Sequence, residues 1–161
     1  MHCIFIDTEF TDFIDIHLIS LGLVSSTGEE FYAEIPYPDA SCSPFVREAV
    51  IPLLGKIPGA AMSKAALKEA LLHWLNRCHQ LMTPLYICYD FQSDWDLFVD
   101  AVDNEIPAWC QPRFIGNQLC QSTRLHFYMN HGLPMHHALY DARANSEAYM
   151  DDAPPGSELQ S

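Results

Sequence analysis

Asp7-Thr8-Glu9 follows the apolar run His2–Ile6 near the start of the chain. Residues two apart on an extended chain point to the same face, so the carboxylates of Asp7 and Glu9 can bind one cation. Carboxylates beside buried structure are costly unless they are paired or metal-bound. The segment therefore predicts a cation site at the end of a core strand. An exposed strand end is the alternative, since 21 residues of the chain are acidic.

A second acidic segment follows the apolar run Leu85–Tyr89. Asp90, Asp94 and Asp96 lie where this predicted core strand gives way to a predicted helix. Carboxylates at this position can hold a metal ion, but they are also favoured by the positive end of a helix dipole. The sequence alone leaves both explanations open.

The third segment is His136-His137-Ala138-Leu139-Tyr140-Asp141. A helix that begins here places Asp141 about one turn from the histidines. A histidine beside a carboxylate–metal site can act as a general base near neutral pH. Two histidines in a surface loop are the alternative interpretation.

The pattern of apolar residues predicts a single α/β domain. An opening meander of three strands is followed by alternating helices and strands, which is typical of a mixed sheet flanked by helices. The expected strands are His2–Ile6, Leu18–Val24, 31–35, Leu85–Tyr89 and 113–115. The expected helices are 45–54, 63–79 with Ser63 as N-cap, 94–102, 119–130 and 137–150.

Composition indicates a folded protein that stays in the cytoplasm. The chain has 161 residues, of which 49% are hydrophobic, and this is enough for one core. It contains no apolar run of roughly 18 residues that could cross a bilayer, and no basic region precedes its first apolar stretch. The six cysteines form no CxxC pair, so we expect reduced, buried thiols.

A net charge of −13 with only 8 Lys plus Arg excludes a protein that binds a long stretch of phosphate backbone. Such a chain can still bind a nucleic acid end if divalent ions neutralise its carboxylates. No EF-hand pattern and no compact set of His and Cys is visible, which disfavours a calcium sensor and a zinc hydrolase.

The order and spacing of the three segments resemble the DEDDh group of 3′–5′ exonucleases, over Ile4 to about Tyr149. Asp7-Thr8-Glu9 matches the first motif, Asp94 matches the second best, and His136 to Asp141 matches the H-x-A-x-x-D third motif. The D-T-E-F start and the stretch Phe45–Leu54 are similar to small bacterial and phage exoribonuclease-like proteins.

The chain departs from the family pattern before its second motif. Gln92 and Ser93 stand where relatives often carry Asn and an aromatic residue, so Asp90 or Asp96 could replace Asp94 as the ligand. The family spacing selects His136 as the catalytic imidazole and leaves His137 as the variable position.

The resemblance implies a ribonuclease H-like domain over residues 1–152. The segment 153–161 contains Pro, Gly and Ser, so we expect it to be a flexible tail. It further implies two divalent ions, Mg²⁺ or Mn²⁺, and release of nucleoside 5′-monophosphates. The implied metal ligands are Asp7, Glu9, Asp94 and Asp141, and His136 is the implied base that deprotonates the attacking water.

The substrate implied by the resemblance is a single-stranded or 3′-overhanging nucleic acid end, with RNA favoured. Thr8, Phe10 and Trp95 are candidate substrate contacts, the last two because aromatic rings can stack on a terminal base. For Phe10 and Trp95 a place in the core is the alternative. A DNA exonuclease and a catalytically silent binding module on the same fold remain alternatives, and relatives of this kind are often homodimers.

Overall fold

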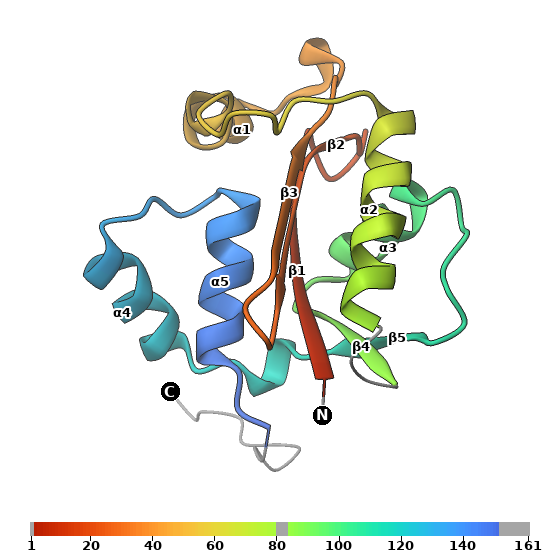
Figure 1. Cartoon of the computed structure of the whole chain (residues 1–161). Helices are drawn as coiled ribbons and strands as arrows, with labels where there is room; N and C mark the ends of the chain where they lie inside the picture. Colours follow the sequence, from red (N-terminus) through yellow and green to blue (C-terminus); the bar gives the residue numbers. More distant parts are fainter. Residues whose placement is uncertain (1, 80–83, 152–161) are drawn as a thin grey trace.

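The structure is a computed structural model that describes residues 2–79 and 84–151 (Figure 1). Its five-stranded sheet has the order β3-β2-β1-β4-β5. The first three strands are antiparallel neighbours, whereas β4 and β5 run parallel to β1. The strands are β1 (His2–Phe10), β2 (Leu18–Ser25), β3 (Glu30–Glu34), β4 (Leu85–Tyr89) and β5 (Cys110–Phe114).

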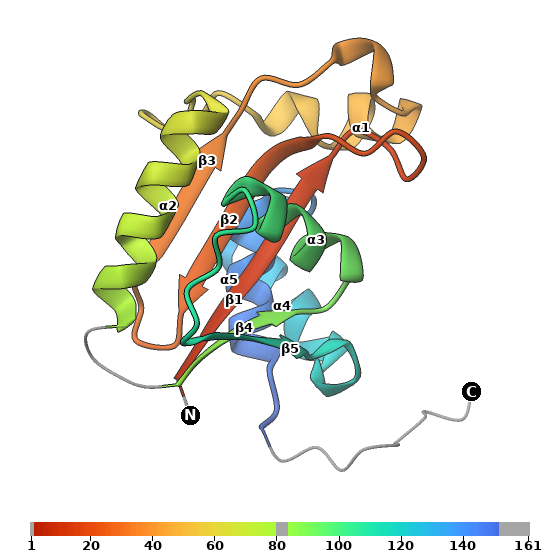
Figure 2. The ribbon, with the colours of Figure 1, turned by 90° about the vertical axis from the view of Figure 1, so that its right-hand side faces the viewer.

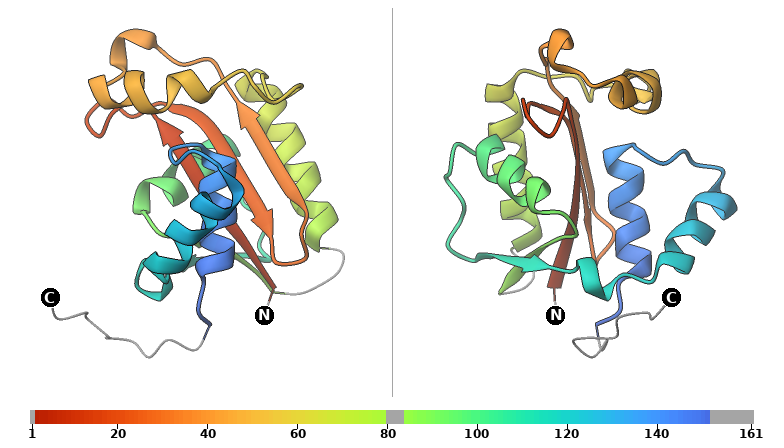
Figure 3. Two further views of the ribbon diagram at one scale, coloured as in Figure 1. Left: turned by 90° about the vertical axis from the view of Figure 1, so that its left-hand side faces the viewer. Right: turned by 180° about the vertical axis from the view of Figure 1, so that it is seen from behind.

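Helices cover both faces of the sheet, as Figures 1 and 3 show. On one side lie α2 (Lys64–His79) and α3 (Gln92–Ala101), and on the other lie α4 (Gln121–His131) and α5 (Ala138–Ala148). The short α1 (Pro44–Ala49) lies across the end of the sheet at which β1 finishes (Figure 2). The predicted mixed α/β sheet flanked by helices is therefore confirmed.

Two apolar layers hold the helices to the sheet. The larger layer joins Ile4 and Ile6 of β1 to Leu71 and Leu75 of α2, and the smaller one joins Phe5 to Ala148 of α5 and its neighbours. Every residue of β2 is buried, because helices cover it on both faces. The predicted N-cap of α2 is confirmed, since the Ser63 hydroxyl accepts a hydrogen bond from the Ala66 amide at 3.1 Å.

The first strand is longer than the sequence predicts. It continues through Asp7 and Glu9 to Phe10 instead of ending at Ile6, because β2 pairs with it as far as Phe10. On its other edge β4 pairs with it only from His2 to Phe5. The second half of β1 therefore has one edge without a strand partner, and this is where its acidic residues lie.

The remaining expectations concern the C-terminal tail, the domain boundary, the cysteines and membrane-spanning helices. The proposed flexible tail, 153–161, lies outside the described residues, and the proposed domain boundary at 152 stays a prediction. All six cysteines are free thiols. Within the described part of the chain, no helix is long and apolar enough to span a membrane.

Candidate active site

Asp7 and Glu9 lie on the face of β1 that α5 covers. They are two residues apart on the strand and share this face, as the sequence predicts. Thr8 lies between them and points to the opposite face. There its backbone amide and its hydroxyl both donate to Asp94 Oδ1 of α3, at 3.1 and 2.7 Å. The free edge of β1 thus binds the start of α3, and Asp94 is buried there.

Gly22 allows α5 to approach this face of the sheet. It lies opposite Asp7 on β2, and a Cβ atom at this position would lie 2.4 Å from backbone atoms of Ala138 and Leu139. The first turn of α5 therefore rests directly on the backbone of β2. This contact brings Asp141, in that first turn, close to the carboxylates of β1.

The carboxylates and one histidine form two adjacent groups. Glu9, His136 and Asp141 each offer a ligand atom within 4.8 Å of the others, and so do Asp7, Asp90 and Asp94. Oxygen-rich groups of this kind suit hard divalent cations such as Mg²⁺ and Mn²⁺. The donor set therefore fits the metal ions that the sequence leads us to expect.

Tertiary packing distinguishes His136 from His137. His136 has a left-handed backbone conformation, with φ of 64°, and its amide donates to Asp141 Oδ2 at 3.1 Å. The His136 ring lies edge-on to Phe45, with 4.9 Å between centroids, beside the carboxylates. His137 instead is buried between the rings of Tyr32 and Tyr140, away from the site, and burial lowers its pKa.

The three aspartates of the second segment also separate. Asp94 lies inside the site and so does Asp90, whereas Asp96 is exposed and accepts a hydrogen bond from Gln92 at 2.9 Å. The sequence treats Asp90 and Asp94 as alternatives, but the structure brings both carboxylates to the same group. Asp96 lies outside it.

Burial and mutual repulsion make these carboxylates hard to ionise. Burial, together with the nearby Asp141 and Asp94, raises the pKa of Glu9 to about 8. Burial is also the main cause that raises the pKa of Asp94 to about 7, against the opposing hydrogen bonds from Thr8. The pKa of Asp7 is raised well above its ordinary value by burial and by the neighbouring carboxylates. A bound cation would relieve both effects.

Helices α4 and α5 add polar residues that the sequence did not single out. The Tyr128 hydroxyl donates to Asp141 Oδ1 at 2.8 Å, the Arg124 guanidinium lies 3.3 Å from Asp90 Oδ2, and the Asn145 amide donates to Asp90 Oδ1 at 3.0 Å. A spacing of four residues places Arg124 and Tyr128 on one helix face, and likewise Asp141 and Asn145. That spacing was the one signal in the sequence that could have indicated them.

A pocket of about 410 Å³ opens beside the carboxylates. Its lining includes the aromatic rings of Phe10, Phe13 and Phe45, together with Glu9 and His136. Trp95 is not among the residues that line it. Trp95 belongs to α3, and its ring stacks on Tyr89 and packs against the core, which is the alternative that the sequence left open.

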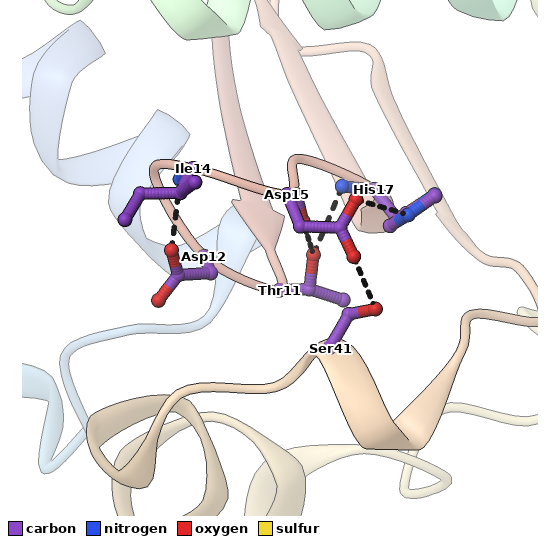
Figure 4. Close-up of polar contacts among 6 residues, drawn as sticks. All are labelled: Thr11, Asp12, Ile14, Asp15, His17 and Ser41. Carbon is purple, nitrogen blue, oxygen red and sulfur yellow. Dashed lines mark hydrogen bonds and ion pairs between the residues drawn. The ribbon is translucent and has the colours of Figure 1, made fainter.

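The loop between β1 and β2 fixes one wall of this pocket. The Thr11 hydroxyl donates to the Asp15 carbonyl at 2.7 Å and accepts from the His17 amide at 2.9 Å, and Figure 4 draws these residues together. The Ser41 hydroxyl donates to Asp15 at 2.5 Å, and the Ser43 amide donates to the Thr11 carbonyl at 2.9 Å. The loop that carries Phe13 is therefore tied to the segment that leads into α1.

The architecture is similar to a solved nuclease structure. The nuclease domain of 3'hExo, described as a DEDDh family member bound to rAMP, matches with a TM-score of 0.57 and 13% sequence identity. The match covers 90% of this chain and 88% of that one. It shows a shared ribonuclease H-like fold. No protein-family model and no curated protein matches the sequence.

The raised carboxylate pKa values predict how the metal-free protein responds to pH. Glu9 binds its proton up to about pH 8 in the folded chain but only to about pH 4.5 when unfolded. Between these two pH values the folded state holds more protons than the unfolded state. The free energy of unfolding therefore decreases as pH rises from about 4.5 to 8. In EDTA we expect Glu9→Gln to raise the melting temperature more at pH 8 than at pH 5. Thermal scans at both pH values test this, and an equal shift would contradict it.

Divalent metal should remove the same repulsion. At pH 8, millimolar Mn²⁺ or Mg²⁺ should raise the melting temperature of the wild-type protein by about 3 °C or more, the shift that roughly 1 kcal/mol produces in a domain of this size. The effect should be smaller at pH 5, where protons compete for the carboxylates. Calcium-free buffers with and without EDTA provide the comparison. A melting temperature that neither ion changes at pH 8 would refute the prediction.

Gly22→Ala should displace α5 from the sheet. The added methyl group meets backbone atoms that cannot move alone, so we expect a loss of stability of about 1–3 kcal/mol and weaker Mn²⁺ binding. Gly28→Ala, in the turn between β2 and β3, is the control, because its added methyl group meets open space. Its positive φ costs some stability, but Mn²⁺ binding should stay unchanged. Denaturant unfolding and Mn²⁺ titration measure both effects. Wild-type behaviour of Gly22→Ala would show that the close approach is not needed.

Proposed function

We propose that this protein is a divalent-metal-dependent 3′–5′ exonuclease that acts on single-stranded or 3′-overhanging nucleic acid ends, with RNA as the favoured substrate. One observation carries the proposal: β1, α3 and α5 bring four carboxylates together, and His136 lies beside them at the rim of a pocket. These are the four acids and the histidine that resemble the DEDDh motifs, namely Asp7, Glu9, Asp94, Asp141 and His136.

The carboxylates are suited to hold two divalent ions. In this proposal Asp7, Glu9 and Asp141 would hold one ion, and Asp7 and Asp94 would hold the other. Bound Mg²⁺ or Mn²⁺ would supply neutralising charge for the phosphate and would help to activate water. Thr8 orients Asp94 through two hydrogen bonds, and Tyr128 and the His136 amide orient Asp141. Thr8 therefore has a positioning role in this proposal.

His136 is assigned as the general base. Its ring lies beside Glu9 and Asp141, and it is partly exposed at the pocket, so a proton that it accepts can pass to solvent. It takes a proton from the water that attacks the terminal phosphodiester. The water oxygen bonds to phosphorus and the bond to the 3′ oxygen of the shortened strand breaks. A nucleoside 5′-monophosphate is released, and the 3′ oxygen is protonated.

The aromatic pocket is assigned to the terminal nucleotide. Phe10 and Phe45 are positioned to contact a base, and the bound rAMP in the 3'hExo nuclease domain supports a ligand of this class. A small pocket also agrees with the net charge of −13, because a protein that holds one or two nucleotides needs few phosphate contacts.

A digestion assay tests the reaction. Single-stranded RNA and DNA of one sequence, labelled at the 5′ end, should shorten stepwise from the 3′ end with Mn²⁺ or Mg²⁺ and stay intact in EDTA. Loss of the base in His136→Ala should lower kcat by about 10²- to 10⁴-fold. His126→Ala, at an exposed position of α4, is the matched control. No shortening of either polymer by folded, metal-bound protein would refute the proposal and favour a silent binding module.

The pocket assignment has its own test. Phe10→Ala should raise KM for the oligonucleotide by about 5- to 100-fold with a smaller effect on kcat, since base stacking is worth roughly 1–3 kcal/mol. Phe114→Ala removes a half-exposed ring of β5 that does not line the pocket and serves as the control. Equal KM values for both variants would show that Phe10 only packs against the protein.

A further inference from the structure

Asp90 is a carboxylate of the site that the four-acid motif does not include. It follows β4 directly, and one of its oxygen atoms lies within 4.8 Å of ligand atoms of Asp7 and Asp94. Its side chain is only 19% exposed. The first half of the site, around Glu9 and Asp141, has no such additional carboxylate among the described residues.

Asp94 has limited capacity to bind a cation by itself. Its Oδ1 already accepts two hydrogen bonds from Thr8, which leaves mainly the second oxygen for a cation. Asp7 is shared between the two groups in the proposed function. A cation held by Asp7 and Asp94 alone would therefore have few protein ligands, and Asp90 lies where a further one is needed.

Without a bound metal ion, the positively charged side chain of Arg124 contacts a carboxylate of the site. Its guanidinium forms an ion pair with Asp90 at 3.3 Å, and its side chain is 21% exposed. Over residues 2–79 and 84–151, the other Lys and Arg ion pairs involve acidic residues outside the two metal-binding groups. With Asp7, Asp90 and Asp94 ionised, Arg124 reduces the local charge from −3 to −2, the charge that one divalent ion balances.

Asn145 supplies an independent sign that this part of the site has a further ligand. It is fully buried, and its amide nitrogen donates to Asp90 Oδ1 at 3.0 Å. Its carbonyl oxygen is buried with no hydrogen-bond partner in the described structure. A buried amide oxygen without a donor is costly, and a water molecule of a hydrated cation would satisfy it.

We propose that Asp90 is a fifth acidic ligand, which holds the second divalent ion together with Asp7 and Asp94, and that Arg124 competes with this ion for Asp90. The inference rests on the proposed metal-dependent function. It makes Asp90 a metal ligand of this chain beyond the four-acid motif, and it makes Arg124 a residue that regulates metal affinity. The two residues consequently have opposite effects on metal binding.

Mn²⁺ titration of the full chain, followed by calorimetry and by the electron paramagnetic resonance of free Mn²⁺, tests the inference without any activity measurement. Asp90→Asn should weaken binding of the second ion by about 10- to 100-fold, a range seen when residues around a metal site are removed. Arg124→Gln should strengthen it, because the competitor for Asp90 is lost. Asp96→Asn, an exposed neighbour, should bind as the wild type does.

The outcomes separate the inference from the proposed function. If both Asp90→Asn and Arg124→Gln lower the melting temperature while the affinity for the second Mn²⁺ is unchanged, the ion pair is structural and the inference is overturned. Tighter binding by Arg124→Gln cannot arise from misfolding, so that variant keeps the test decisive if Asp90→Asn folds poorly. If Asp94→Asn also binds two ions as the wild type does, the proposed metal site itself fails.

Discussion

Repulsion among buried carboxylates is the constraint on which this structure depends. Asp7, Glu9, Asp94 and Asp141 come from three separate elements, and their burial raises the pKa of each. A fold that served only stability would keep such groups apart or exposed to water. The surrounding elements instead hold them together, with Thr8 and Tyr128 as neutral hydrogen-bond donors, an arrangement that suits bound cations.

The sheet provides the space for this cluster. Since β4 separates from β1 after Phe5, the second half of β1 has a free edge, and α3 enters there to place Asp94 against Thr8. On the covered face, the missing side chain of Gly22 lets α5 rest on the β2 backbone beside Asp7. One strand thus displays acidic residues to one helix and a hydroxyl to another, which is possible because alternate residues of a strand face opposite sides.

Helix α4 connects the two halves of the site. Tyr128 contacts Asp141 in one group and Arg124, one turn earlier, contacts Asp90 in the other. One helix thus contributes a polar contact to each group. This arrangement places a positive charge next to the carboxylates in a chain whose net charge is −13.

The sequence by itself determined the mixed α/β fold and the placement of Asp7 and Glu9 on one face, because both follow from local periodicity along strands and helices. It also indicated Asp94 and Asp141 through their positions at helix starts. The resemblance in motif spacing selected His136 over His137 and favoured Asp94 over Asp90 and Asp96, but local sequence pattern alone left these choices open. Those choices depend on the left-handed backbone conformation of His136, on the aromatic rings that enclose His137 and on which helix faces pack together. Contacts between residues distant in the chain, such as Arg124 with Asp90, exist only after the sheet and its two helical layers have assembled.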